Sequence, residues 1–159
     1  MSRPAVEARA PRAGDAEALV ASMRPQDRAE VEAIRGPGQE LEAVRRGIEM
    51  SVLAWTFTIG SEMACICGVV PVSLMSDRGV PWLLGTTAMD RHPGALIRVA
   101  PAYIARMLAA FPHLLNGVDA RNTLAVRWLR RAGFTLHPAV PVGPQGVPFH
   151  PFEMDVRNV

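Results

Sequence analysis

Side chains suited to covalent or acid–base chemistry are few in this chain, and two of the usual types are nearly missing. All 17 basic residues are arginine, so the sequence contains no lysine. This excludes a Schiff-base lysine, a lysine general base and the lysine of a P-loop. Tyr103 is the single tyrosine, so a mechanism that needs a phenol has one candidate. A compositional bias toward arginine and alanine explains the missing lysine more simply than function does.

Two cysteines, Cys65 and Cys67, lie one residue apart in an apolar stretch. Alternate residues share one face of a strand, and a disulfide over so short a spacing would be strained. No group of further Cys and His residues stands nearby to complete the four ligands that zinc prefers. We therefore expect two reduced thiols in a buried strand and no metal site.

Length and charge place the chain among ordinary globular proteins. Its 159 residues, 49% of them hydrophobic, predict a single domain over residues 1–159 with a sizeable core. The formal charge of +2 gives little reason to expect nucleic-acid binding. The N-terminus lacks the apolar region of a signal peptide, and the longest apolar run is too short to span a bilayer. We expect a soluble, intracellular protein without membrane contact.

Hydrophobic periodicity predicts the elements that must position the polar side chains. Helices are expected over residues 16–23, 25–35, 39–50 and 101–111, and between Asn122 and Gly133. Strands are expected over residues 6–10, 52–59, 63–72, 80–84 and 114–118, followed by two strands joined by a proline-rich arm. Asp15 is expected to cap the first helix, and Pro81 to interrupt the pairing of its strand. Residues 85–100 show no clear pattern.

This order of elements predicts an α+β fold, in which a mixed β-sheet is flanked by helices. The last two strands should form a C-terminal β-hairpin that carries the proline-rich arm. In the middle of the chain a strand, a helix and a strand follow one another, which requires at least one parallel pair of strands.

The best-defined helix carries a recognisable motif. Asn122 is suited to cap it, Ala125 lies on its apolar face, and Gly133 followed by Phe134 closes it. This segment resembles the last motif of the GNAT acetyltransferase superfamily, where an Asn opens a helix, an Ala follows three residues later and Gly-Phe ends it. The order of elements along most of the chain is also similar to that of the superfamily.

Residues 23–30, 80–86 and 119–129 carry a narrower resemblance. They are similar to a phage-encoded branch of the superfamily, the internal virion protein A family of T7-like phages. This resemblance implies a bacteriophage protein in the cytoplasm of the bacterial host cell or in the virion. Its implied partners are other proteins of a phage particle, or a second copy bound through the proline-rich arm, residues 137–151.

The GNAT resemblance implies transfer of an acetyl group from acetyl-CoA to an amine, with no metal. The family's cofactor turn opens a helix whose backbone N–H groups face the pyrophosphate. Arg91 and Gly94 match the first half of that turn, and Thr86 and Thr87 add hydroxyl groups. Asn122, at the motif helix, completes the expected cofactor-binding set.

Two leucines depart from the family pattern. Leu96 replaces the second small residue of the cofactor turn, where its side chain could obstruct the phosphates. Leu129 stands seven residues after Asn122, where the family has a tyrosine near the leaving thiolate. Leucine cannot donate a proton, and loss of a positioned acid removes a rate factor of about 10²–10⁴. Tyr103 is expected on another helix, facing the core.

The catalytic base stays open between two residues. His92 is expected at the mouth of the cofactor groove, and the ordinary pKa of histidine, about 6.5, suits a base near neutral pH. A lone histidine in a loop is more often simply exposed to solvent, without a role. Glu62 is the second candidate, and Asp90 is a weaker one.

Two functions of different classes follow. The first is a GNAT-fold acyltransferase that uses acetyl-CoA; the second is a catalytically degenerate GNAT-fold protein with a structural or assembly role in the virion. An open, V-shaped groove beside residues 86–94 would favour the first, whereas a groove filled by Leu96, Trp82 or the helix that begins at Pro101 would favour the second. Nucleic-acid binding through Arg127, Arg130 and Arg131 is the weakest alternative, because acidic residues nearly balance the basic ones.

Overall fold

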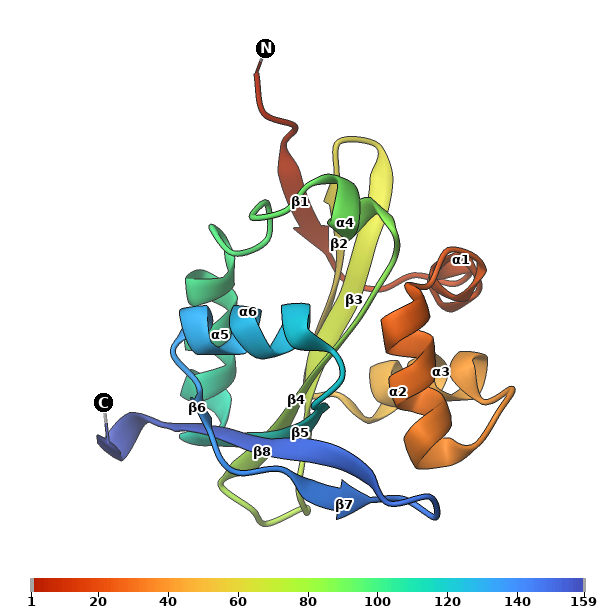
Figure 1. The fold of residues 1–159 in the computed structure, drawn as a ribbon. Helices are drawn as coiled ribbons and strands as arrows, with labels where there is room; N and C mark the ends of the chain where they lie inside the picture. Colours follow the sequence, from red (N-terminus) through yellow and green to blue (C-terminus); the bar gives the residue numbers. More distant parts are fainter. Residues whose placement is uncertain (1, 159) are drawn as a thin grey trace.

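Within residues 2–158, the part of the chain that the computed structural model describes, eight strands form one β-sheet (Figure 1). Strands β1 (Val6–Arg9), β2 (Leu53–Ile59), β3 (Glu62–Pro71) and β4 (Arg78–Gly85) pair in antiparallel fashion in that order. Strand β5 (His113–Asp119) is parallel to β4 and antiparallel to β8 (Val147–Asp155). Strands β6 (Thr135–Leu136) and β7 (Val140–Val142) both pair with β8. The predicted mixed sheet with a parallel pair is confirmed.

Helices cover both faces of the sheet (Figure 1). Helices α1 (Asp15–Ala21), α2 (Pro25–Arg35) and α3 (Glu40–Met50) lie on one side, with Leu19, Val44 and Ile66 in the core between α1, α3 and the sheet. Helices α5 (Ala100–Ala110) and α6 (Thr123–Ala132) lie on the other side, above a core that contains Leu114 and Phe134. The predicted α+β class is therefore confirmed.

The local signals at the helix ends explain most of these bounds. Helix α2 begins and ends where the sequence predicts, with Gly36 at its C-terminus. The prediction that Asp15 caps α1 is wrong, because Gly14 holds that position and Asp15 is the first helical residue. The carboxylate of Asp15 instead accepts hydrogen bonds from Arg9, from the backbone N–H of Arg12 and from Thr56. The bond from Arg9 is the largest influence that lowers the pKa of Asp15 to about 2.

The expectation that Pro81 interrupts its strand is also wrong. The register of β3 and β4 runs unbroken from Cys65↔Gly85 to Pro71↔Gly79, and Pro81 lies opposite Val69 within it. Its carbonyl oxygen accepts a hydrogen bond from Asn116 of β5, so the polar edge of Pro81 faces away from β3. The missing N–H therefore lies on the outer edge of β4, where no ladder bond to β3 is lost.

Residues 85–100, which show no clear sequence pattern, and the C-terminal region differ most from the predicted elements. Residues 85–100 contain the short helix α4 (Ala88–Arg91) and a series of turns that leads into α5. The C-terminal region holds three strands, β6, β7 and β8, where two strands joined by the proline-rich arm were expected; β7 and β8 form the C-terminal hairpin, and a short helix η1 (Val156–Asn158) follows. Cys65 and Cys67 are buried in β3 as free thiols that form no disulfide. No helix among residues 2–158 is both long and apolar enough to cross a bilayer.

Candidate active site

A cleft opens where β4 and β5 separate. The two strands pair only at Arg78↔His113 and Gly79↔Leu114, and beyond these residues they diverge (Figure 1). The cleft has a volume of about 880 Å³ and is lined by both strands, by α2 and α3 on one side and by α6 on the other. The V-shaped groove that would favour the acyltransferase hypothesis is therefore present and open.

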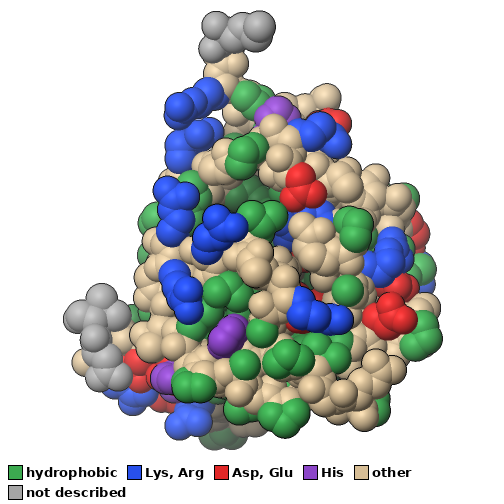
Figure 2. Space-filling view, viewed as in Figure 1, with side chains coloured by type: hydrophobic (Ala, Val, Ile, Leu, Met, Phe, Trp, Pro, Cys, Tyr) green, Lys and Arg blue, Asp and Glu red, His purple; other side chains and the backbone are tan. Residues whose placement is uncertain are grey.

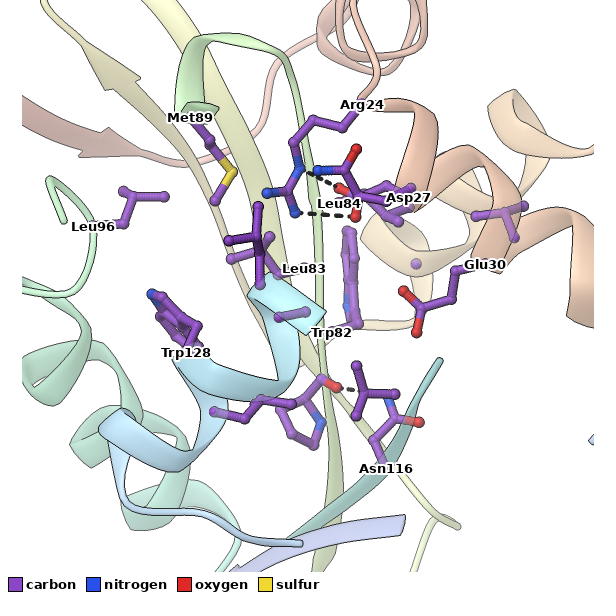
Figure 3. Close-up of a pocket in the computed structure, with 18 of the residues that line it drawn as sticks. Arg24, Asp27, Glu30, Trp82, Leu83, Leu84, Met89, Leu96, Asn116 and Trp128 are labelled. Atoms are coloured by element: carbon purple, nitrogen blue, oxygen red, sulfur yellow. Dashed lines mark hydrogen bonds and ion pairs between the residues drawn. The ribbon is translucent and has the colours of Figure 1, made fainter. Parts of the chain in front are cut away.

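One side-chain amide closes the vertex of the V. Asn116 of β5 donates from Nδ2 to the carbonyl oxygen of Pro81 at 2.8 Å. Its Oδ1 accepts a hydrogen bond from the backbone N–H of Gly117, also at 2.8 Å. The amide thus replaces backbone pairing at the point where the strands part (Figure 3). The amide thereby gives hydrogen-bond partners to the carbonyl of Pro81 and the N–H of Gly117, which would otherwise lack them.

The outer edge of β4 offers backbone hydrogen-bonding groups to the cleft. Pro81 and Gly85 both direct their polar edge away from β3, toward Asn116 and Asp27. Leu83 lies midway between them at the two-residue spacing of a strand, so its N–H and C=O face the same way. Neither group of Leu83 has a hydrogen-bond partner among the described residues. An extended ligand could therefore pair with β4 at this point.

A buried ion pair anchors α2 to the far end of β4. Arg24 donates from Nε and Nη2 to the two carboxylate oxygens of Asp27 at 3.1 and 3.0 Å, and Asp27 also accepts the N–H of Gly85 at 2.7 Å. The backbone N–H of Arg24 donates to the carbonyl oxygen of Gly85 at 3.0 Å. Asp90 of α4 lies 3.7 Å from Nη1 of Arg24. These bonds hold α2 against the cleft (Figure 3).

Glu30, one turn after Asp27 on α2, presents its carboxyl group to the cleft (Figure 3). Its Oε1 accepts a hydrogen bond from the backbone N–H of Asp119, the last residue of β5, at 2.9 Å. Burial raises the pKa of Glu30 to about 7, with the charges of Asp27 and Asp119 acting in the same direction. A carboxylate with a pKa near neutral pH is suited to accept a proton from a substrate.

Trp82 forms a wall of the cleft on the side of α2 and α3, and does not fill it. Its Nε1 donates to the hydroxyl of Ser51 at 2.8 Å. A Cβ atom at Gly47 of α3 would lie 3.0 Å from the Trp82 ring, so glycine at that position lets the indole lie flat against the helix. Figure 3 shows Trp82 between Glu30 on one side and Trp128 on the other.

The turn that precedes α5 supplies donors at the other end of the cleft. Gly94 adopts a φ of +83° in this turn and lines the cleft together with Leu96 and Ile97. The backbone N–H groups of Gly94, Leu96, Ile97 and Arg98 have no acceptor among residues 2–158. Free N–H groups in a turn that leads into a helix favour the binding of an anion.

Four arginines add positive charge to the cleft: Arg35, Arg46, Arg127 and Arg131. All four are exposed, and none forms an ion pair with another described residue. Figure 2 shows basic side chains beside hydrophobic ones on the face that carries α6. A groove with this charge attracts anionic ligands.

The structure brings only part of the predicted site into the cleft. His92 and Gly94 line it. Thr86 is buried and donates its hydroxyl to the carbonyl oxygen of Met63, while Thr87 is exposed and accepts from Arg91 at 3.4 Å. Arg91 also donates to Glu62 at 2.7 Å, and these two exposed residues lie outside the cleft lining.

Asn122 acts as the cap that the sequence predicts. Its Oδ1 accepts the N–H of Ala125 at 3.2 Å, and Gly133 ends α6 with a φ of +101°. The side chain is buried and does not line the cleft. The described contacts thus give Asn122 a structural role in positioning α6, whereas its predicted contact with a cofactor stays a prediction.

Leu96, which was expected to obstruct the cofactor turn, is only 7% exposed. It packs in a core cluster that includes Phe57 and Cys65, and so borders the cleft without filling it. Leu129 of α6 also borders the cleft. Tyr103 faces the core as expected, with its ring edge-on to Trp55 and Phe57 at centroid distances of 5.0 and 4.7 Å.

Sequence reasoning missed Glu30, Arg24 and Asp27 as site residues. All three fall in residues 23–30, which carry the resemblance to phage proteins, but no chemical role was assigned to them. The i, i+3 spacing of Arg24 and Asp27 at the start of a helix was the one local sign of an ion pair. Nothing local separates Glu30 from the exposed Glu32 on the same helix.

Comparisons with solved structures identify the architecture. A GCN5-related N-acetyltransferase from Kribbella flavida superposes with a TM-score of 0.69 and 17% identity, over 95% of this chain and 98% of that one. The ribosomal-protein-S18-alanine N-acetyltransferase from Escherichia coli matches with a TM-score of 0.64 and 17% identity, over 96% and 94% of the two chains. The fold is that of the GNAT acetyltransferases.

A third GNAT structure was solved with ligands. The spermidine N-acetyltransferase from Vibrio cholerae, in complex with CoA and spermine, matches with a TM-score of 0.69 and 10% identity over 96% of each chain. By sequence, neither a protein-family model nor a curated protein matches the chain. None of these three structures is a phage protein, so the likeness to internal virion proteins stays a prediction. Among residues 2–158 no group of three or more His, Cys, Asp and Glu side chains could hold a metal ion.

Proposed function

We propose that this chain is an N-acyltransferase that moves an acyl group from acyl-CoA to an amine, with Glu30 as the general base. The observation that carries the proposal is the position of Glu30, whose pKa is raised to about 7, in the cleft where β4 and β5 separate. A carboxyl group whose pKa is close to neutral pH therefore lies in the cleft beside the free edge of β4.

Three features of the cleft suit an acyl-CoA donor. The free N–H groups of residues 94 and 96–98 suit its pyrophosphate, and the cleft arginines add charge of the right sign. The N–H and C=O of Leu83 suit the amide groups of an extended pantetheine arm. The spermidine N-acetyltransferase structure, of the same fold, was solved in complex with CoA, the part that all such donors share.

The donor supplies an activated thioester, and the remaining chemistry falls to the chain. Glu30 in its carboxylate form accepts a proton from the acceptor's ammonium group, which leaves a neutral amine as nucleophile. The amine nitrogen forms a bond to the acyl carbon and releases its extra proton to water, the bond from that carbon to sulfur breaks, and the sulfur leaves as thiolate. The hydrogen bond from Asp119 N–H to Glu30 fixes the orientation of the carboxyl group.

Neither Leu129 nor Tyr103 supplies the proton that the leaving thiolate needs. Leu129 cannot donate a proton, and Tyr103 lies in the aromatic cluster against Trp55 and Phe57. The proton therefore comes from water in the open cleft. His92, which also lines the cleft, is the second candidate for the base.

Release of free CoA from acetyl-CoA, measured with a panel of amines, tests this proposal. Glu30→Gln is expected to lower kcat/KM by about 10²–10⁴, because the base is lost. Calorimetry should give an unchanged Kd for acetyl-CoA. In the unaltered chain, kcat/KM should rise with pH through about 7, as Glu30 loses its proton.

Two matched variants separate the possible outcomes. Glu32→Gln changes an exposed glutamate of the same helix and should leave kcat/KM unchanged. If His92→Asn removes activity and Glu30→Gln does not, the assignment of the base is wrong. Absence of any heat of binding with millimolar acetyl-CoA and with its longer acyl homologues would overturn the proposal as a whole and favour the catalytically degenerate alternative.

A further inference from the structure

A second cavity, which we call the apolar chamber, adjoins the cleft on the side of α5 and α6. It has a volume of about 110 Å³. Its lining is made by hydrophobic and aromatic side chains of the sheet, the turn before α5, α5 itself and α6, and includes Cys67, Leu83, Leu96, Tyr103 and Leu129. Water inside it would find few polar partners, so an apolar group is the suitable occupant.

The chamber and the cleft share part of their walls. Leu83, Leu96, Trp128 and Leu129 line both, and Figure 3 shows Leu83, Leu96 and Trp128 on the side of the cleft opposite Glu30. Leu83 is also the residue whose backbone N–H and C=O face the cleft without a partner. A ligand paired with β4 at Leu83 would thus lie beside the chamber.

The two leucines that depart from the GNAT motifs meet at this chamber. Leu96 stands in place of a small residue and Leu129 in place of a tyrosine, and both line it. Along the sequence the two departures are separate, one at the phosphate site and one at the acid site. In three dimensions the two substitutions have one common effect, which is to place branched aliphatic side chains around a single apolar space.

We propose that the apolar chamber receives the acyl chain of the donor, and that this chain is longer than acetyl. The proposal rests on the acyltransferase function proposed above. A cavity of about 150 Å³ in another protein holds benzene, so the chamber has room for about four carbon atoms. Butyryl is therefore the chain length that we expect to fit, with two methylene groups more than acetyl.

Calorimetry with acetyl-, propionyl-, butyryl- and hexanoyl-CoA tests the chamber directly. Burial of each methylene should tighten binding about fourfold, so butyryl-CoA should bind roughly 10- to 20-fold more tightly than acetyl-CoA. Equal or weaker binding of butyryl-CoA would overturn the proposal and leave the acyltransferase function intact. Absence of binding by every member of the series would instead overturn both.

Variants at Leu129 identify the occupant. Leu129→Tyr fills the chamber and should remove the advantage of butyryl-CoA while acetyl-CoA binding is retained. Leu129→Ala enlarges it and should move the optimum toward hexanoyl-CoA, which keeps the test valid if the tyrosine variant does not fold. Leu74→Tyr, at a residue 99% exposed in the β3–β4 loop, is the matched control and should change nothing.

The pantetheine arm is the alternative occupant, because all four donors share it. If Leu129→Tyr weakens the binding of all four acyl-CoA molecules by one common factor, the chamber holds that arm and the proposal is wrong. A change that grows with the length of the acyl chain supports the proposal.

Discussion

Replacement of Glu30 by glutamine should stabilise the folded chain at pH 8, at the same time as it removes the proposed base. Burial raises the pKa of Glu30 to about 7, against an ordinary value of 4.5 in an unfolded chain. Between these values the folded state binds more protons than the unfolded state. The free energy of unfolding therefore falls as the pH rises through this window. Glutamine carries no charge and retains an oxygen that can accept the N–H of Asp119.

The size of the effect follows from the two pKa values. Their difference corresponds to about 3 kcal/mol once the pH exceeds both. Glu30 lines an open cleft, so water screens part of this cost, and we expect Glu30→Gln to gain about 1–3 kcal/mol at pH 8. At pH 5 most Glu30 side chains are protonated in the folded state, and the gain should shrink to about a quarter of that.

Urea unfolding of both chains at pH 5 and pH 8 measures this difference. Glu32→Gln, an exposed change on the same helix, should stay within about 0.5 kcal/mol of the unaltered chain at both pH values. The reasoning is refuted if the stability gain of Glu30→Gln is the same at both pH values, or if the variant is less stable at pH 8.

Two further substitutions test the framework around the cleft. Asp27→Asn leaves the buried guanidinium of Arg24 with only the more exposed Asp90, 3.7 Å away, as counter-charge. This change should lower the free energy of unfolding by about 3 kcal/mol, measured in urea; Asp77→Asn, at an exposed carboxylate, is the control. Asn122→Ala removes the cap of α6 and should cost about 1 kcal/mol, with an unchanged calorimetric Kd for acetyl-CoA. A large loss of acetyl-CoA affinity in the second variant would instead support the predicted cofactor role of Asn122.

The parts of the fold that local signals determine were predictable. Gly36 and Gly133 have the positive φ that ends or follows a helix, and Asn122 has the side chain that caps one, so α2 and α6 were placed closely. The mixed sheet followed from the order of the elements along the chain. Asp15 shows the limit of such signals, because its carboxylate bonds to Thr56, a residue 41 positions away.

The site depends on contacts between distant segments, which one sequence does not reveal. Glu30 bonds to the N–H of Asp119, 89 positions further along, and its raised pKa arises from burial that only the assembled fold produces. Asp27 likewise meets Gly85 across 58 positions. Pro81 was the available sign, because a proline inside a strand indicates an edge without a ladder partner. Here that edge is the one that faces the cleft.

The junction of β4 and β5 also has a mechanical consequence. The sheet is continuous across it at two residue pairs and one side-chain amide, so its two halves are joined by a narrow hinge, and the Glu30–Asp119 hydrogen bond is a second link across the cleft. At about 3.3 Å per residue, the far end of β4 lies about 20 Å from that hinge, and a rotation of about 5° would displace it by about 2 Å. A ligand that contacts both β4 and β5 would add a further connection between the two halves of the sheet.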